Sequence, residues 1–229
     1  MKKYLSYGMA GGSLHAFIGA VHRIGAGFDG IAALKAGCFS RNPEKNQECG
    51  DFYQLDKERI YSSFEEMAQK EGAREDGIDY VVISAPNNEH YETAKVFLQN
   101  GIHVLCEKPL CFEVSEAEEL KKLAQEKGLL FCVNYSYSGN NMVKEARELV
   151  KNGYIGDVIN VNAEYLQEYL VDDIGKGDQT MNKLSSWRKD PAVAGISNCV
   201  GDIGSHIENT VSYITGLRLK RVAAKLDYF

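Results

Sequence analysis

Two places in the sequence carry residues that could do acid–base or electrostatic chemistry. The stretch GIHVLCEKPL ends an apolar run with Glu107, Lys108 and Pro109, and the stretch DIGSH carries Asp202 four residues before His206. A lysine held at the end of a buried strand can stabilise negative charge that develops on an oxygen, and a histidine can carry a proton because its unperturbed pKa is about 6.5. Each has a structural alternative, since such a Glu-Lys pair is usually a surface ion pair of under ~1 kcal/mol and a lone histidine usually serves packing.

The elements that must position Lys108 come from an alternation of strands and helices in the first half of the chain. Five apolar runs lack a polar alternation, as strands of a parallel sheet covered on both faces do: KYLSY, IAALKAGCF, DYVVISA, IHVLCE and LLFCVNY. Helical stretches separate them. The first half therefore predicts right-handed crossovers and a doubly wound parallel sheet, an α/β domain of the Rossmann type over residues 1–135.

Two of these helices show both a start and an end in the sequence. In SEAEELKKLAQEKG we expect Ser115 and Glu118 to form a capping box and Gly128 to end the helix. In EHYETAKVFLQNG, Phe97 belongs to the inward face and Gly101 is the stop.

The pattern changes after about residue 135. NNMVKEARELVKNG and SHIENTVSYITG predict amphipathic helices, DVINVNAEYLQEYL alternates apolar and polar residues like a strand of a one-sided sheet, and LKRVAAKLDYF predicts another strand. These elements predict a second, α+β domain over residues 136–229, and the boundary is expected within Asn134–Gly139.

A glycine-rich turn follows the first strand, in YGMAGGSLHAFIGAVHRIG. Such a turn entering a helix lets backbone N–H groups and the positive helix end receive a pyrophosphate. The full G-x-G-x-x-G pattern is absent, because Ala10 takes the second glycine position and Ser13 the third. We predict that the dinucleotide is bound by Gly8, Ala10, Gly11, Gly12 and Ser13. An ordinary strand-to-helix turn is the alternative.

The end of the second strand should lie near the adenine ribose of a bound dinucleotide. An acidic residue there would bind a 2′-hydroxyl, whereas an arginine would pair with a 2′-phosphate. CFSRNPEK offers Ser40 and Arg41 and no acid at the strand end. This favours NADP over NAD as the cofactor and leaves NAD open, with a solvated turn as the structural alternative.

The turn in ISAPNNEHYETA follows the third apolar run. Pro86 ends the strand, and Asn87 or Asn88 could cap the following helix. The functional interpretation puts Pro86 and Asn87 beside the nicotinamide ribose instead. The sequence leaves both interpretations open.

Together these motifs resemble the glucose–fructose oxidoreductase and inositol dehydrogenase family (Gfo/Idh/MocA). GIHVLCEKPL with APNNEH is similar to the family's Glu-Lys-Pro after a strand, and SSWRKDPAVAGISNCVGDIGSHIEN looks like its Trp-Arg segment followed by an aspartate, a glycine and a histidine, here Asp202, Gly204 and His206 in DIGSH. The resemblance implies an NAD(P)-dependent oxidoreductase in which His206 carries the proton and Lys108 holds and polarises the reacting oxygen. Asp202 would bind a substrate hydroxyl or orient the imidazole.

The resemblance also implies further contacts with the cofactor and the substrate. Glu107 would position Lys108 or pack near the cofactor. Tyr165 and Gln167 are expected to line a sugar pocket with the three catalytic residues, because of their place on the first strand of the second domain and their capacity for hydrogen bonds. The remaining expected cofactor contacts are Pro86, Asn87, His90, Trp187 and Arg188.

The chain departs from the family pattern at its end. Family members continue past the histidine-bearing helix into a large, open, mostly antiparallel sheet that usually packs against a partner subunit. Only two of its strands are expected here, so the sheet looks incomplete and leaves an edge with unpaired backbone groups. A natural short form, a truncation and completion by another chain are all open. A completed sheet would make a homo-oligomer.

The sequence is compatible with three functions. The first is hydride transfer between a nicotinamide cofactor and a secondary alcohol of a sugar, cyclitol or related polyol. The second is a dinucleotide-binding regulator or scaffold without turnover, which the missing strands favour and the retained Lys108, Asp202 and His206 oppose. The third is an enzyme that uses its cofactor transiently to break a glycosidic bond.

Composition bears on partners and location. The 229 residues are 44% hydrophobic and 25% charged with a net charge of −6, which gives no electrostatic reason to expect nucleic acid or an anionic membrane. No signal peptide or membrane span fits. The six cysteines form no C-x-x-C, so we expect reduced thiols in a cytoplasmic protein without a metal site, with Cys38, Cys106 and Cys132 as small hydrophobes in strands. The histidines given no catalytic role are His15, His22, His90 and His103.

Overall fold

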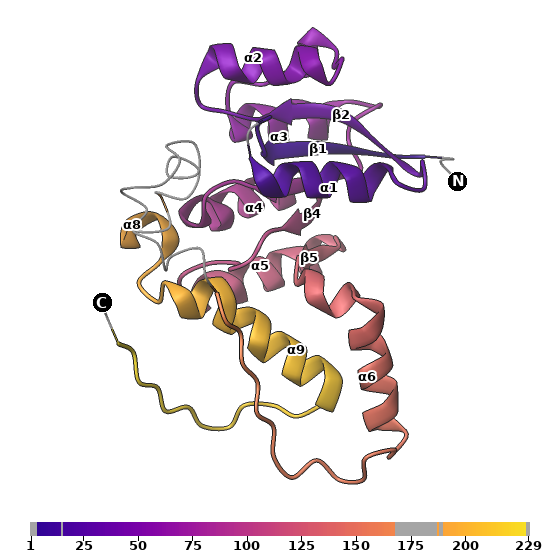
Figure 1. Cartoon of the computed structure of the whole chain (residues 1–229). Coiled ribbons are helices and arrows are strands. Elements are labelled where there is room, and N and C mark those ends of the chain that lie inside the picture. The colour runs from indigo at the N-terminus through magenta and orange to yellow at the C-terminus, as the bar shows by residue number, and fades with distance from the viewer. Residues whose placement is uncertain (1–3, 15, 168–186, 188–189, 228–229) are drawn as a thin grey trace.

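The structure is a computed structural model that describes residues 4–14, 16–167, 187 and 190–227 (Figure 1). Five parallel strands form one sheet in the order β2-β1-β3-β4-β5. They are β1 (Leu5–Gly11), β2 (Ala32–Cys38), β3 (Tyr80–Ser84), β4 (His103–Cys106) and β5 (Phe131–Val133). The predicted doubly wound parallel sheet is confirmed. The chain passes from β1 to β2 on one side and to β3 on the other, which creates a topological switch point between β1 and β3.

Helices cover both faces of this sheet (Figure 1). Successive strand residues point to opposite faces. Met9 therefore packs with α1 and α2, whereas its neighbour Ala10 packs with α3, α4 and α5. The helices are α1 (Phe17–Gly27), α2 (Pro43–Phe52), α3 (Phe64–Ala73), α4 (His90–Gln99), α5 (Val114–Lys127), α6 (Asn141–Lys151), α8 (Pro191–Ala194) and α9 (Ser205–Thr215). Shorter 3-10 turns are η1 (Lys57–Arg59), η2 (Asn87–Glu89) and η3 (Ser136–Gly139), and η5 (Val200–Gly204) is π-helical.

Local signals explain where several helices begin and end. The capping box of α5 is formed by Glu113 and Glu116, so the predicted pair of Ser115 and Glu118 is wrong by two positions. Both pairs fit the same short pattern, and the helix begins at the earlier one. Gly128 ends α5 in a left-handed conformation with φ 64°, as predicted. Gly101, just beyond α4, has φ 80°.

The second part of the chain contains the two predicted helices but not the predicted strands. α6 lies against α9, where the Arg147 guanidinium donates to the carbonyl of Tyr213 at 2.7 Å and stacks on its ring. Residues 157–167 and 217–227 have no strand assignment and run as open traces in Figure 1. A strand forms where a neighbour supplies hydrogen bonds, and neither segment pairs with the other. Ile159, 96% exposed, and Val222, 76% exposed, lie on them.

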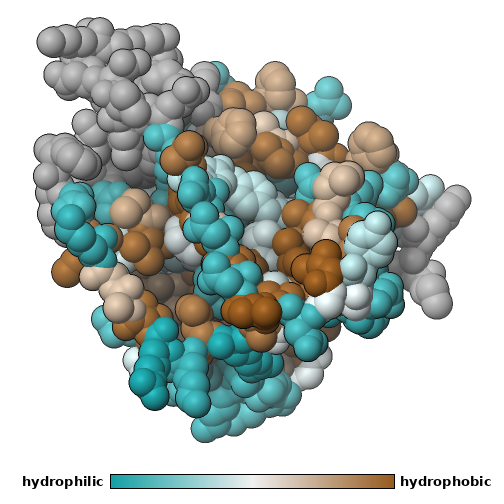
Figure 2. All heavy atoms as spheres, turned by 60° about the horizontal axis from the view of Figure 1, so that its bottom comes forward, coloured by the Kyte–Doolittle hydropathy of each residue, from teal (hydrophilic) through white to brown (hydrophobic). Residues whose placement is uncertain are grey.

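The surface of this end of the molecule is mixed. Figure 2, which turns the lower end of Figure 1 forward, shows brown apolar side chains among teal polar ones. Within the described residues no helix is long and apolar enough to cross a membrane.

The cysteines differ in burial. Cys38, Cys49 and Cys106 are buried, whereas Cys132 is exposed, so its interpretation as a buried small hydrophobe is wrong. The reason is that β5, which carries Cys132, is the edge strand of the sheet. All six are free thiols, and the described part of the chain holds no cluster of three or more His, Cys, Asp or Glu side chains suited to a metal ion.

Candidate active site

The glycine turn lies at the carboxyl end of β1, beside the switch point. Gly11 has φ 85° and Gly12 has φ 72°, values that favour glycine. A Cβ on Gly11 would come within 2.7 Å of the backbone nitrogen of Ala85, so only glycine lets these two turns meet. A Cβ on Gly19 in α1 would lie 2.6 Å from the Cα of Gly12. Gly19 thus gives the close helix approach of the fingerprint, and the sequence reading missed it because it lies beyond the expected spacing.

Gly8 and Ala10 lie within β1 and not in the turn. Both are buried, and a Cβ on Gly8 would collide with Met67 on the α3 side of the sheet. Gly8 therefore serves strand packing. The backbone that remains available to a dinucleotide is that of Gly11, Gly12 and Ser13.

The start of α1 keeps unused hydrogen-bond donors. Its N-cap residue, Ala16, makes no side-chain cap, and the first turn contains no acidic residue. Nearby, the buried Oγ of Ser84 has no partner in the described structure, and it would lie 2.8 Å from a Cβ placed on Gly12. Three features therefore fit a dinucleotide phosphate. They are the backbone amides at the start of α1, the absence of Cβ atoms at Gly11 and Gly12, and the hydroxyl of Ser84.

The end of β2 carries a surface ion pair. The Arg41 guanidinium donates to Glu89 at 2.7 Å, with side chains 84% and 16% exposed, respectively. The Ser40 hydroxyl accepts from the backbone of Asn42 at 3.2 Å. The pair joins the β2 end to the η2 turn beyond β3, and a 2′-phosphate would have to compete with Glu89 for Arg41.

The turn after β3 contacts the second part of the chain. The Asn87 side chain donates to the carbonyl of Ala194 at 3.0 Å, and α4 has no side-chain cap, so the predicted capping by Asn87 or Asn88 is wrong. Pro86 precedes η2 at the sheet edge. Asn87 therefore joins the strand edge to α8.

His90 is almost fully buried, with 1% of its surface exposed. Its Nδ1 lies 2.7 Å from the carbonyl oxygen of Pro109 and its Nε2 lies 2.9 Å from that of Ala85. Both ring nitrogens are thus occupied. The predicted direct contact of this side chain with the cofactor is not compatible with this arrangement.

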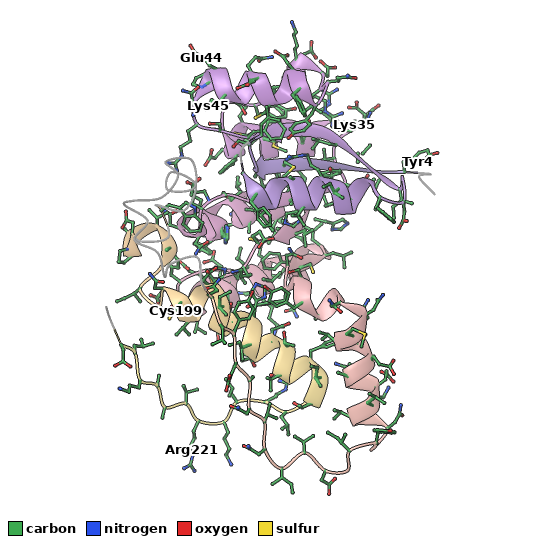
Figure 3. The ribbon with its side chains drawn as sticks, in the orientation of Figure 1. Tyr4, Lys35, Glu44, Lys45, Cys199 and Arg221 are labelled. Carbon is green, nitrogen blue, oxygen red and sulfur yellow. The ribbon has the colours of Figure 1, made fainter. Side chains whose placement is uncertain are left out.

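Lys108 points across to the second part of the chain. Its ammonium donates to the carbonyl oxygen of Asp202 at 2.6 Å and to the Asp202 carboxylate at 2.8 Å. Lys108 and Asp202 are 15% and 25% exposed in their side chains, so this is a partly buried pair. Asp202 lies in η5, whose start is marked by the labelled Cys199 in Figure 3.

Glu107 does not pair with the Lys108 ammonium, which excludes a surface Glu-Lys pair. Its carboxylate accepts from His22 at 2.8 Å, from the Asn134 side chain at 2.6 Å and from the Lys108 backbone at 3.2 Å. Burial works to raise the pKa of Glu107, but the hydrogen bonds from His22 and Asn134 outweigh it and hold that pKa below its usual value. The buried carboxylate of Glu107 therefore holds His22, Asn134 and the Lys108 backbone in place through hydrogen bonds.

His206 lies in the first turn of α9 with 6% of its surface exposed. Its buried Nδ1 has no hydrogen-bond partner among the described residues. Burial, and then the positive charge of Lys108, lower the pKa of His206, so the ring is held neutral and can accept a proton. Lys108 from the sheet edge and His206 from α9 are therefore brought together.

Tyr165 reaches this cluster through a residue that the sequence reading missed. The hydroxyls of Tyr137 and Tyr165 lie 2.7 Å apart, and the Tyr137 ring lies 4.4 Å from the His206 ring. The hydrogen bond with Tyr165, together with burial, raises the pKa of Tyr137 to about 12. Two tyrosines in NYSYSG, at the expected domain boundary, were the signal available. Gln167 is exposed.

The Trp-Arg segment is described only in part. Trp187 is partly buried, and its carbonyl accepts from the backbone of Asp190 at 3.1 Å. Arg188 lies outside the described residues. The predicted cofactor contacts of both remain predictions.

The chain matches known proteins over most of its length. Residues 7–135 match a family model described as an oxidoreductase family with an NAD-binding Rossmann fold, and residues 143–229 match the GFO/IDH/MocA C-terminal domain. The uncharacterized oxidoreductase YfiI of Bacillus subtilis (strain 168) is 39% identical over 207 residues, which cover 90% of this chain and 52% of that protein.

Two further matches carry chemical names. The levoglucosan dehydrogenase of Pseudarthrobacter phenanthrenivorans is 30% identical over 139 residues, which cover 61% of this chain and 33% of that protein. The crystal structure of an inositol dehydrogenase homolog complexed with NAD+ from Azotobacter vinelandii is 30% identical with a TM-score of 0.88, covering 94% of this chain and 55% of that one. The chain spans about half, or less, of the length of these proteins.

Proposed function

The chain belongs to the Gfo/Idh/MocA family of NAD-binding oxidoreductases, and on that premise we propose that it transfers a hydride between a nicotinamide cofactor and a secondary alcohol of a sugar, cyclitol or related polyol. Relatives named for levoglucosan and inositol support this substrate class. The observation that carries the proposal is that the charge of Lys108 acts on His206, whose buried Nδ1 has no hydrogen-bond partner among the described residues.

The dinucleotide would be held at the switch point. The backbone of Gly11, Gly12 and Ser13 and the open start of α1 would bind its phosphates, and the Ser84 hydroxyl has a free donor beside them. The nicotinamide, when bound, supplies the acceptor for the hydride. Arg41 supports NADP, and the NAD+ in the inositol dehydrogenase homolog supports NAD, so the preference is decided by the titration below.

The acid–base step would use residues of both parts of the chain. As the carbinol carbon loses its hydride, the hydroxyl oxygen loses its proton to Nδ1 of His206, which is neutral and therefore able to accept it. The Lys108 ammonium would stabilise the negative charge that develops on that oxygen. The two hydrogen bonds that Asp202 accepts from the Lys108 ammonium support a role in holding Lys108.

Substrate recognition would involve two tyrosines of the second part of the chain. The Tyr137–Tyr165 pair beside His206 supports a polar pocket wall that could meet sugar hydroxyls. A homo-oligomer through the second-domain sheet would need strands that residues 157–167 and 217–227 do not form here.

A cofactor titration followed by a substrate test decides the proposal. NADH and NADPH are added in parallel, and quenching of Trp187 and tyrosine fluorescence measures binding. Wild-type protein is then tested for reduction of NAD+ or NADP+ by a panel of cyclitols and anhydrosugars. Binding with polyol-dependent reduction supports the proposal. Binding without reduction by any polyol would instead favour a regulator, and no binding of either cofactor would overturn it.

A further inference from the structure

We propose that two buried histidines, His22 and His90, are positioning residues that fix Lys108 by holding its two chain neighbours, one from each face of the sheet. The importance of Lys108 for turnover rests on the proposed function, whereas its positioning does not. Glu107 and Pro109 flank Lys108, and their contacts with the two histidines carry this proposal.

Lys108 needs such support because the strand ladder stops just before it. The last ladder bond at this edge runs from the Glu107 nitrogen to the carbonyl oxygen of Ile83 at 2.9 Å. The Lys108 nitrogen bonds the side chain of Glu107 instead, and Pro109 has no N–H to donate. The backbone that carries the lysine is therefore held by side chains rather than by the sheet.

His22 holds the residue before Lys108. It projects from α1, and its Nε2 lies 2.8 Å from one carboxylate oxygen of Glu107, with side chains 8% and 10% exposed. Asn134, just beyond β5, donates to the same oxygen at 2.6 Å. The other oxygen of Glu107 accepts from the Lys108 backbone. The orientation of Glu107, and with it the Lys108 amide, is thereby fixed from the α1 face.

His90 holds the residue after Lys108 from the opposite face. It is the first residue of α4, and its ring joins the carbonyl oxygens of Pro109 and Ala85. The ends of β4 and β3 are thus joined by one buried ring. Carbonyl oxygens only accept, so a doubly protonated ring satisfies both contacts and a neutral ring satisfies one.

The surroundings of His90 lower its pKa and so favour the neutral ring. Burial lowers the pKa of His90, which favours the neutral ring, whereas its two carbonyl contacts and the carboxylates of Glu107 and Glu89 act the other way. The neutral ring donates to one of the two carbonyl oxygens and packs between both strand ends.

The test replaces each histidine by phenylalanine, which keeps the bulk and removes the donors, and by glutamine, which keeps a donor. The matched control is His103, which lies at the opposite end of β4 and accepts from the Leu130 backbone at 3.0 Å. Thermal melting establishes folding, and cofactor titration establishes that the glycine turn is intact.

We expect His22→Phe and His90→Phe to lower kcat about 10- to 100-fold, with KM and cofactor Kd changed by less than about 3-fold, because a misplacement near 1 Å has that effect. The glutamine variants should recover part of kcat. His103→Phe should leave kcat unchanged. Wild-type kcat in both phenylalanine variants, or an equal loss in the control, overturns the proposal.

A second measurement needs no turnover. Amide hydrogen exchange at Lys108 should quicken at least 10-fold in both phenylalanine variants, and exchange at Leu130 should quicken only in His103→Phe. Unchanged exchange at Lys108 overturns the positioning even if the enzyme is active. Quickened exchange in a protein that turns over no polyol supports the positioning while the proposed function fails. If a phenylalanine variant does not fold, Asn134→Ala, which removes the other side-chain donor to Glu107, takes its place with the same expected exchange at Lys108.

Discussion

The two parts of the chain use similar sequence patterns with different results. In the first part, strands such as β3 lie between neighbours that accept and donate along their whole length. In the second part, residues 157–167 and 217–227 carry apolar residues that predict strands, yet form none. The comparison teaches that an apolar pattern specifies a strand only where another strand completes its hydrogen bonds.

The candidate site lies where the two parts meet. Lys108 comes from the sheet edge, whereas Asp202 and His206 come from η5 and α9. The second part thus reaches the candidate site through packed helices and through Tyr165, which lies on one of its unpaired segments. Five experiments test how differently the two parts behave.

Removing a buried charge partner should have the largest effect. In the first part, Glu71 is 1% exposed and accepts from the Arg59 guanidinium, the Tyr61 hydroxyl and the Ile78 backbone. Glu71→Ala should lower the free energy of unfolding by about 3–5 kcal/mol, because it leaves the buried arginine charge with only the exposed carboxylate of Asp76, 3.5 Å away, as an ionic partner. Urea denaturation measures this. Glu148→Ala in α6 is the counterpart in the second part and should change stability by under ~0.5 kcal/mol.

Substituting either Lys108 or His206 should reduce enzyme activity by a free energy nearly as large. Lys108→Met and His206→Gln should each lower kcat/KM about 100- to 1,000-fold by removing electrostatic or proton-transfer assistance. Steady-state kinetics with the best polyol measures the loss. The exposed lysine of the Glu66–Lys70 pair is the control, and Lys70→Met should keep wild-type activity. A large loss in only one of the two variants would mean that the parts do not act together.

The pH dependence should report the contact between the parts. Because burial and Lys108 lower the pKa of His206, the neutral base persists below its ordinary range, and alcohol oxidation should decline only beneath that lowered pKa, by up to tenfold per pH unit. Lys108→Met should move the pKa of His206 upward, as measured by the NMR titration of its ring. An unchanged titration would show that the two charges do not meet in solution.

One substitution made at two isoleucines compares packing directly. Ile83→Val in β3, where the side chain is 0% exposed, should lower the free energy of unfolding by about 0.5–1.5 kcal/mol. Ile159→Val, where the side chain is 96% exposed, should change it by under ~0.5 kcal/mol. Thermal and urea unfolding measure both. A comparable loss at Ile159 would mean that its segment is covered in solution.

The smallest effect concerns cofactor choice at the switch point. If Arg41 binds a 2′-phosphate, Arg41→Ala should weaken NADPH binding about 3- to 10-fold and leave NADH binding unchanged, in keeping with one exposed charge contact. Glu89→Gln should strengthen NADPH binding by freeing the guanidinium. Equal effects on both cofactors would remove the basis for an NADP preference.

Local signals allowed much of the first part to be predicted. The strand runs and the inward Phe97 follow from hydrophobic pattern alone, and all are confirmed. Gly8 was misplaced because a strand glycine and a turn glycine look alike in sequence. Two contacts arise only from the fold: that of His22 with Glu107, 85 positions apart, and that of Tyr137 with His206. No local spacing in the sequence predicts them.

The second sheet could not be predicted for a different reason. Its strands depend on partners, and a pattern in one segment carries no information on whether the partner is present. Asp202 and His206 lie on adjoining helical turns, and their nearness follows from a spacing of four residues that the sequence shows directly.

The ammonium of Lys108 has three N–H bonds, and Asp202 receives two of them through its carbonyl and carboxylate oxygens. Among the residues that the structure describes, none accepts the third N–H, which is left for an incoming molecule. A sugar presents several chemically similar hydroxyls, but a single remaining donor can engage only one oxygen at a time. If the proposed function holds, Asp202 leaves the Lys108 ammonium one N–H for the substrate, and the position that reacts is set by which hydroxyl reaches that hydrogen.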